Sequence, residues 1–133
     1  MQQFLLRGAL GAALALAMAM PALSAEPINF TPGNPWTQTI GSVTKTSNYQ
    51  EYSFTADAGK TLQINLISRN PNLYFKVLSA DSRKPLVDTM SSGATTWTTK
   101  PETDGTFTVR VYQDPSTAAT GDVTKYALQI GIY

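Results

Sequence analysis

The chain has 133 residues, with ten Lys and Arg against nine Asp and Glu, no cysteine and no histidine. Without cysteine there can be no disulfide, no thiol nucleophile and no cysteine-ligated zinc, and without histidine the commonest general base is missing. The charge is nearly balanced and shows no clustered basic excess of the kind that binds nucleic acid, so we expect no nucleic-acid partner.

Residues 1–25 are typical of a secretory signal peptide. One arginine precedes an Ala-, Leu- and Met-rich run over residues 9–20, and small, turn-prone residues follow. This run is shorter than the ~20 apolar residues that span a bilayer, so we expect no membrane span; a buried N-terminal helix is the alternative interpretation. We expect cleavage after Ala25, with Ser24 as the alternative, and a periplasmic or secreted product without a lipid-bearing cysteine.

Residues 26–133 are enough for one domain with its own core. Apolar and polar residues alternate with a period of two, which is typical of half-buried strands. The longer expected strands are Trp36–Val43, Tyr49–Ala56, Thr61–Ile67, Leu73–Leu78, Gly105–Tyr112 and Tyr126–Ile132. Shorter ones are expected at Ile28–Phe30, within Pro85–Asp88 and around Trp97, whose indole we expect to cover the edge of the core.

Turn residues separate these segments, as in the Asp57–Lys60 turn, and no apolar residues recur at helical spacing for two turns after Ala25. About eight short strands joined by such turns indicate an all-β fold. We therefore predict a single antiparallel two-sheet β-sandwich, which buries one face of each sheet and leaves the other in water.

The strand over Gly105–Tyr112 has the clearest alternation. Its apolar residues Phe107, Val109 and Val111 are expected in the core. Its polar residues, which include Arg110 and Tyr112, are expected on the outer face. Arg110 has two interpretations. It is a solvated or cross-strand-paired side chain, with Glu51 or Glu102 as partner, or a planar donor fork for a carboxylate on another protein, with Tyr112 and Tyr126 nearby.

No catalytic motif is present. The sequence lacks a GxSxG elbow and a Gly-rich phosphate loop, so we expect no enzymatic activity and no cofactor. Calcium, which takes oxygen ligands, is the one metal to weigh, through Asp104, Asp114 and Asp122. These residues lack the spacing of a calcium loop and stand in turns, where Asp bonds the backbone, so we predict no metal site.

Two blocks of the chain resemble a known family. The first is Tyr49–Leu66, which reads Y-Q-E-Y-S-F-T-A-D-A-G-K-T-L-Q-I-N-L. The second is Asp104–Gln113, which reads D-G-T-F-T-V-R-V-Y-Q and is followed by T-K-Y-A-L-Q-I over Thr124–Ile130. Together they resemble the bacterial pre-peptidase C-terminal (PPC) β-sandwich, and the periplasmic inhibitors of goose-type lysozyme, which are small exported proteins similar to that domain.

The resemblance implies a non-enzymatic inhibitor that blocks the active-site cleft of a goose-type lysozyme. In such inhibitors a small-residue–Gly–x–aromatic turn and nearby polar side chains enter the cleft. Carried over to this sequence, the partner-binding residues are Asp104, Gly105, Phe107, Arg110, Tyr112, Gln113 and Tyr49. The alternative is a stand-alone PPC-like module that binds cell-wall polymer or another exported protein; a calcium-dependent adhesin domain is a third interpretation.

Overall fold

A computed structural model describes residues 25–114, 116 and 122–133, so the expected signal peptide lies outside the described residues except for Ala25. The strands are β2 (Glu26–Pro27), β3 (Trp36–Thr44), β4 (Tyr49–Ala56), β5 (Leu62–Ser68), β6 (Leu73–Ser79), β7 (Val87–Asp88), β8 (Thr96–Thr99), β9 (Gly105–Gln113) and β10 (Val123–Ile132). One 3-10 turn, η3 (Thr89–Ser91), follows β7. No helix in the described residues is long and apolar enough to cross a membrane.

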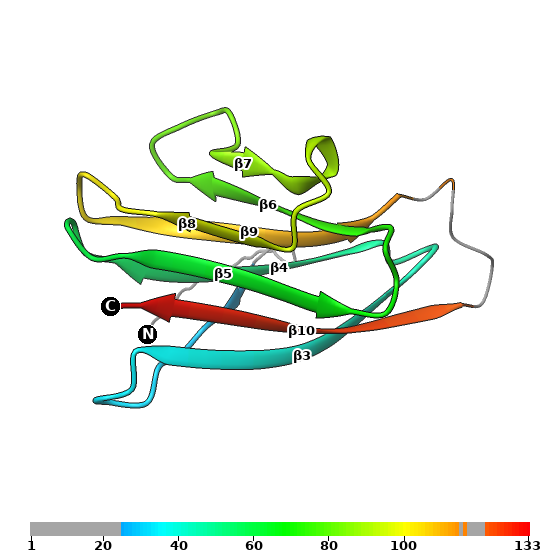
Figure 1. The fold of residues 1–133 in the computed structure, drawn as a ribbon, viewed down its shortest axis with the longest axis horizontal. Helices are drawn as coiled ribbons and strands as arrows, with labels where there is room; N and C mark the ends of the chain where they lie inside the picture. Colours follow the sequence, from blue (N-terminus) through cyan, green and yellow to red (C-terminus); the bar gives the residue numbers. More distant parts are fainter. Residues whose placement is uncertain (1–24, 115, 117–121) are drawn as a thin grey trace, which may run out of the picture.

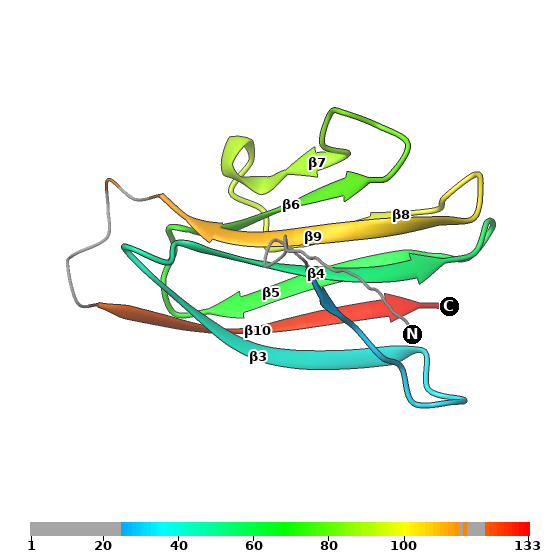
Figure 2. The same ribbon diagram turned by 180° about the vertical axis from the view of Figure 1, so that it is seen from behind.

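Two sheets pack face to face. One has four strands in the order β3-β10-β5-β8 and lies nearer the viewer in Figure 1; the other has five, in the order β2-β4-β9-β6-β7, and lies nearer in Figure 2. All strand pairs are antiparallel except β2 with β4. The predicted two-sheet β-sandwich is confirmed, with nine strands in the described part of the chain.

The short N-terminal strand lies slightly earlier than expected. It is β2 at Glu26–Pro27, not Ile28–Phe30, although the Ile28 amide still donates to the Ser53 carbonyl at 2.8 Å. The two-residue β7 lies inside the segment predicted for it, and β8 contains Trp97, which is half-buried against the core. Trp97 thus covers the core as predicted.

The core consists of the inward-facing members of the alternating strands. They are Val43, Tyr52, Phe54, Ala56, Leu62, Ile64, Leu66, Leu73, Phe75, Val77, Phe107, Val109, Val111, Tyr126, Leu128 and Ile130. Each fully buried aliphatic or aromatic side chain contributes about 1.5–3 kcal/mol, so a core of this size needs no disulfide. The alternation in the sequence predicted these residues because strand side chains point to opposite faces in turn.

A buried tyrosine pair joins the two sheets. The hydroxyls of Tyr52 on β4 and Tyr126 on β10 lie 2.6 Å apart, and burial raises the pKa of both phenols. Gly41 on β3 leaves the room for them, because a Cβ there would lie 2.6 Å from the Tyr52 hydroxyl. The expectation that Tyr126 lies near Arg110 is therefore wrong: Tyr126 belongs to the apolar set of its own strand and points into the core.

Candidate protein-binding face

The outer face of the five-stranded sheet, whose strands lie nearer the viewer in Figure 2, carries two rows of side chains, as the strand register shows. One row holds three tyrosines and the other holds two bases flanked by two acids. The members are Tyr49, Tyr112 and Tyr74 in the first row, and Glu51, Arg110, Lys76 and Asp88 in the second. We call these seven residues the tyrosine–charge face.

Arg110 is held in place from two directions. Its Nη2 and Nε atoms lie 2.6 Å and 2.7 Å from the same Glu51 oxygen, Oε2. Its guanidinium carbon lies 4.8 Å from the centre of the Tyr49 ring, within cation–π range. Glu51, and not Glu102, is thus the cross-strand partner. The Arg110 side chain is 36% exposed and that of Glu51 is 17% exposed, so the arginine is the more accessible of the two.

Arg110 and Lys76 stand directly opposite each other on β9 and β6, a pairing of like charges that is unfavourable by itself. Each base is offset by a carboxylate on its other side: Arg110 by Glu51, and Lys76 by Asp88, with Lys76 Nζ 3.9 Å from Asp88 Oδ2. The row is therefore charge-balanced, and each base has a fixed acidic neighbour.

Tyr112 lies at the centre of the tyrosine row. Its hydroxyl donates to Asp88 Oδ1, Lys76 Nζ lies 5.0 Å from its ring centre, and the Tyr74 ring lies 5.9 Å away. Partial burial, together with the hydrogen bond to the Asp88 carboxylate, raises the Tyr112 pKa well above its ordinary value. The phenol is therefore neutral, and keeps its donated proton, throughout the physiological pH range.

Two of the residues expected at a binding site point the other way. Phe107 is 6% exposed and stacks on Phe54 with ring centres 5.8 Å apart. Gln113 is 2% exposed, and its Oε1 accepts from the Thr124 hydroxyl at 3.2 Å. The period of two that places Phe107 in the core places Gln113 there too, because the two positions are an even number of residues apart.

Asp104 and Gly105 lie at the opposite end of β9 from Tyr112. Six residues of strand at ~3.3 Å each separate Asp104 from Arg110, or about 20 Å. Asp104 Oδ1 accepts from the Ala58 amide at 2.7 Å, which ties the turn before β9 to the turn between β4 and β5. A second bond, from the Gly59 amide to the Pro101 carbonyl at 3.0 Å, joins the same two turns.

Of the seven predicted site residues, the structure therefore brings Tyr49, Arg110 and Tyr112 together and separates the other four from them. The same face contains four residues that we did not predict as site residues: Tyr74, Lys76, Asp88 and Glu51, the last of which we had named only as a possible partner of Arg110. The alternation of Leu73–Leu78 places Tyr74 and Lys76 on the outward face. Sequence alone, however, does not say that β6 pairs with β9.

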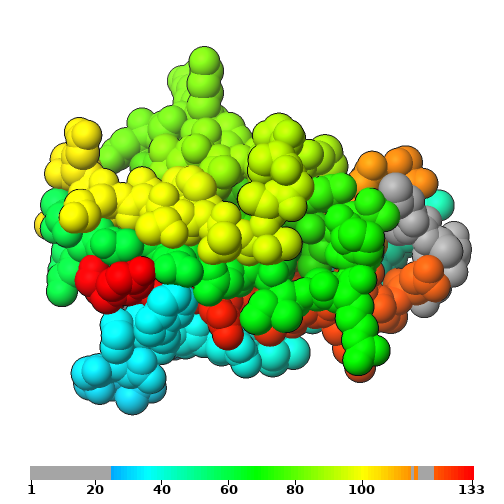
Figure 3. Space-filling view, viewed as in Figure 1, coloured from blue at the N-terminus to red at the C-terminus, as the bar shows by residue number. Residues whose placement is uncertain are grey.

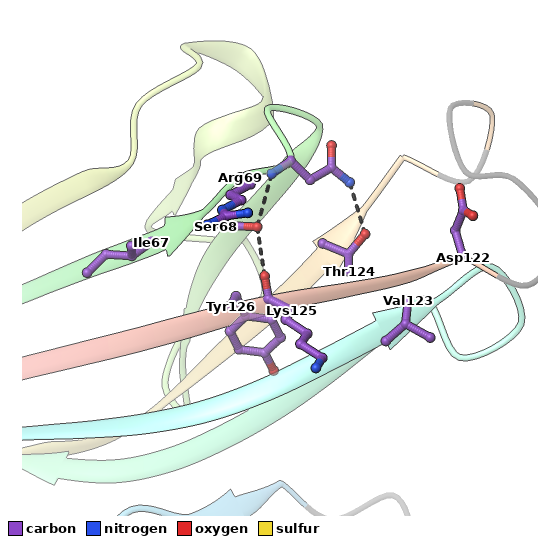
Figure 4. A pocket seen from close by; sticks show the side chains of 9 residues that line it. Ile67, Ser68, Arg69, Asp122, Val123, Thr124, Lys125 and Tyr126 are labelled. Atoms are coloured by element: carbon purple, nitrogen blue, oxygen red, sulfur yellow. Dashed lines mark hydrogen bonds between the residues drawn. The ribbon is translucent and has the colours of Figure 1, made fainter.

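A pocket lies at the end of the sandwich where β5 ends and β10 begins (Figure 4). Its volume is about 870 Å³, and its wall includes Arg69, Asp122 and Lys125. Asn70 orders the wall by donating to the Thr124 hydroxyl at 3.1 Å, and Thr124 in turn donates to Gln113. Gln113 thus supports this end of the molecule from inside.

The calcium interpretation needs Asp104, Asp114 and Asp122 to converge, and it is wrong for the described residues. Asp104 and Asp114 lie on either side of β9, about 30 Å apart along the strand. No group of three acidic, histidine or cysteine side chains in the described part of the chain could hold a metal ion. Asp114 instead accepts from the Ser116 amide and hydroxyl, which lowers the Asp114 pKa.

No protein-family profile and no curated protein sequence matches the chain. Solved structures do match. The crystal structure of Aeromonas hydrophila PliG, a periplasmic inhibitor of g-type lysozyme, has a TM-score of 0.70 and 22% identity, over 83% of this chain and 96% of that one. Salmonella Typhimurium PliG has a TM-score of 0.61 and 17% identity, over 83% of this chain and all of its own.

A pre-peptidase C-terminal domain also matches. The domain from the collagenase of Bacillus anthracis has a TM-score of 0.55 and 14% identity, over 83% of this chain and 95% of that domain. These identities are low, so the likeness concerns the fold. The resemblance seen in the sequence is confirmed at that level: this chain has the β-sandwich fold of the PliG inhibitors and of the PPC domain.

Proposed function

We propose that this protein is an exported, non-enzymatic inhibitor of a goose-type (g-type) lysozyme, and that it blocks the cleft of that enzyme with the tyrosine–charge face. The observation that carries the proposal is the likeness in fold to the PliG inhibitor of Aeromonas hydrophila, over 83% of this chain and 96% of that one. The tyrosine–charge face supplies the residues that a protein partner would contact.

The composition of the face supports protein binding. Tyr and Arg are among the residues that carry most of the energy in protein interfaces. Tyr49 is half-exposed, and Arg110 is already fixed by Glu51 and by the Tyr49 ring. An arginine that is ordered before binding loses less side-chain entropy when the complex forms, so more of its contact energy appears as affinity.

The chemistry of the target supports the same face. Glycoside hydrolases use carboxyl groups in the cleft, and a guanidinium is the side chain best shaped to bind a carboxylate. Arg110 has five N–H donors, more than its contact with a single Glu51 oxygen can use. We infer that Arg110 shares its charge between Glu51 and a carboxylate of the enzyme.

Asp104 and Gly105 remain a separate proposed contact, because Arg110 lies about 20 Å away along the strand. A contact there would have to include the Asp104 carboxylate, which already accepts from the Ala58 amide. The variant Asp104→Asn keeps an oxygen acceptor for that amide and removes the charge. If Asp104 contacts the enzyme, this variant alters inhibition without altering the thermal midpoint; no change in inhibition removes it from the proposed site.

The direct test is the lysis of cell walls by a goose-type lysozyme, followed by turbidity, with and without the purified protein. Inhibition at micromolar protein is expected, and Arg110→Ala is expected to weaken it while the melting temperature stays nearly constant. Lys125→Ala is the matched control, since it removes one exposed positive charge from the other sheet. Absence of inhibition by the unaltered protein would contradict the proposal.

The second candidate is a stand-alone PPC-like module that binds cell-wall polymer or another exported protein. The likeness to the Bacillus anthracis domain favours it. Binding of the purified protein to a goose-type lysozyme in the absence of any cell wall separates the two candidates, because an inhibitor binds the enzyme itself and a wall-binding module does not.

A further inference from the structure

The outer face of the four-stranded sheet, on the far side of the sandwich from Arg110, carries a shallow groove of about 560 Å³. Side-chain amides and one indole form most of its lining. We call it the amide groove and define it by Asn34, Trp36, Gln38, Gln63, Asn65 and Gln129, with Tyr133 beside it. Figure 3 looks onto this side of the molecule, where the red C-terminal residues lie between the cyan residues of β3 and the green residues of β5.

The amides form a hydrogen-bonded ladder across the strands. Asn65 Nδ2 donates to Gln129 Oε1 at 3.2 Å, and Gln129 Nε2 donates to Gln38 Oε1 at 3.0 Å. Gln63 Nε2 and the Thr96 hydroxyl both donate to Asn65 Oδ1, at 3.1 Å and 2.5 Å. The ladder crosses four strands at ~4.8 Å spacing, or about 14 Å.

The ladder fixes the orientation of each amide group and leaves some of the amide N–H donors unused within the ladder. A primary amide carries two N–H groups, and the bonds described above use one from Asn65, one from Gln129 and one from Gln63. Each therefore has a second N–H, and Gln38 enters the ladder through its oxygen. Orientation fixed before binding lowers the entropic cost of engaging a ligand.

An aromatic pair closes one end of the groove. The Trp36 indole lies over Gly131, where a Cβ would come within 2.6 Å of the ring, and it stacks on Tyr133 with ring centres 5.8 Å apart. Tyr133 is held by backbone bonds to and from Thr61, at 2.9 Å and 2.6 Å, and its hydroxyl donates to Gln63 Oε1 at 2.9 Å. It is nevertheless 50% exposed, so the aromatic surface is ordered and accessible.

No side chain that lines the groove carries a charge. A ligand that suits it must be neutral, must offer donors and acceptors at short intervals, and must have an apolar side for the aromatic pair. A sugar chain has this combination, because its hydroxyls both donate and accept while the C–H side of each ring packs on an aromatic surface. We infer that the amide groove is a binding site for a neutral oligosaccharide.

A folded protein partner fits the groove less well. Protein interfaces draw their energy from buried aromatic and Arg anchors in desolvated pockets, whereas the amide ladder is polar and open along its length. The groove also lies on the face of the sheet, since its ladder runs over β3, β10, β5 and β8, so backbone pairing with an added strand does not explain it. The inference does not depend on lysozyme inhibition, which we assign to the opposite face.

The test follows side-chain amide signals by NMR while cellohexaose, or a hexamer of N-acetylglucosamine, is added to the unaltered protein. The amide signals of Gln38, Asn65 and Gln129 are expected to shift with either or both sugars. Gln129→Ala and Tyr133→Ala should each weaken Kd by about 5–10-fold, equivalent to one or two lost neutral hydrogen bonds or the loss of an aromatic contact. Arg110→Ala, on the other face, should bind sugar normally.

Two results would overturn the inference. One is the absence of amide shifts at about 10 mM of both sugars, which rules out even millimolar binding. The other is binding that neither Gln129→Ala nor Tyr133→Ala weakens, since the sugar would then lie elsewhere. Thermal melts identify any variant that fails to fold. Tyr133→Ala is the safer of the two variants because the backbone bonds to Thr61 do not need the side chain.

Discussion

The two outer faces of the sandwich are built by the same rule and carry different chemistry. On the five-stranded sheet, one row pairs acids with bases, as Glu51 with Arg110. The other row places tyrosines beside one another, with Tyr112 at its centre. On the four-stranded sheet, the equivalent row pairs amide with amide, as with Gln129 and Asn65. In both, side chains from neighbouring strands hold each other in fixed positions.

The difference concerns which ligands each face can discriminate. Contacts between charged groups are weakened by salt, so the binding of a partner's carboxylate by Arg110 should respond to ionic strength. An uncharged amide row acts only on contact and through direction, so it suits a neutral ligand and is indifferent to salt. One small sandwich can thus present two independent binding chemistries.

The largest expected effect is on the charged face. Arg110→Ala should weaken lysozyme inhibition by about 30-fold or more, the loss expected when an interface hot spot of about 2 kcal/mol is removed. The measurement is the inhibitor concentration at half-maximal wall lysis. Gln129→Ala, on the amide groove, should change that concentration by less than about two-fold, a difference below 0.5 kcal/mol. Equal losses in both variants would mean that the two faces are not separate sites.

On the amide side, Gly131→Ala should destabilise the fold by about 1–2 kcal/mol. The added Cβ would lie 2.6 Å from the Trp36 ring, so the indole must shift, which disturbs its stacking on Tyr133. Urea unfolding measures the loss, and a shift of tryptophan emission reports the displaced indole. Gly105→Ala is the control: the nearest atom to its Cβ would be 4.0 Å away, so its stability should change little. An undisturbed Gly131→Ala protein would show that the aromatic pair is loosely packed.

Much of the fold could be predicted because it depends on local pattern. The period of two in Gly105–Tyr112 fixed which side chains of that strand are buried, and the Asp57–Lys60 turn fixed where two strands reverse. The N-terminal strand was misplaced by two residues at its start, since Pro27 and its neighbours carry no alternation from which a boundary could be read.

The candidate sites were harder, because they depend on which strands become neighbours. Nothing local says that Arg110 pairs with Glu51 and not with Glu102, or that Gln38 and Gln129, 91 residues apart, share a hydrogen bond. For the same reason, the sequence did not reveal that the Asp104 carboxylate accepts a hydrogen bond from a backbone amide in a turn 46 residues earlier. Register across strands follows from the packing of the whole sheet, which local alternation does not encode.

A smaller effect is expected at alkaline pH. The raised Tyr112 pKa means that folding favours the protonated phenol; its contribution to stability is complete below the ordinary tyrosine value of about 10 and is lost as pH rises above it. Above that pH, the unaltered protein should therefore lose stability more steeply than Tyr112→Phe. Both should decline, since Tyr52 and Tyr126 also have raised pKa values. Urea unfolding from pH 8 to 11 measures the slopes; parallel slopes would contradict the assignment.

The smallest expected effect is that of Glu51→Gln. The ion pair with Arg110 is partly exposed, and such pairs contribute about 0.2–1 kcal/mol, so the melting temperature should fall only slightly. Inhibition should weaken by more than stability does, because the variant replaces the ion pair by a weaker hydrogen bond to a neutral amide oxygen and lets the guanidinium sample other positions. Glu102→Gln removes the same charge from an exposed residue outside the face, and it should change neither quantity. If Glu51→Gln inhibits as well as the unaltered protein at low and high salt, the fixed position of Arg110 does not contribute to binding.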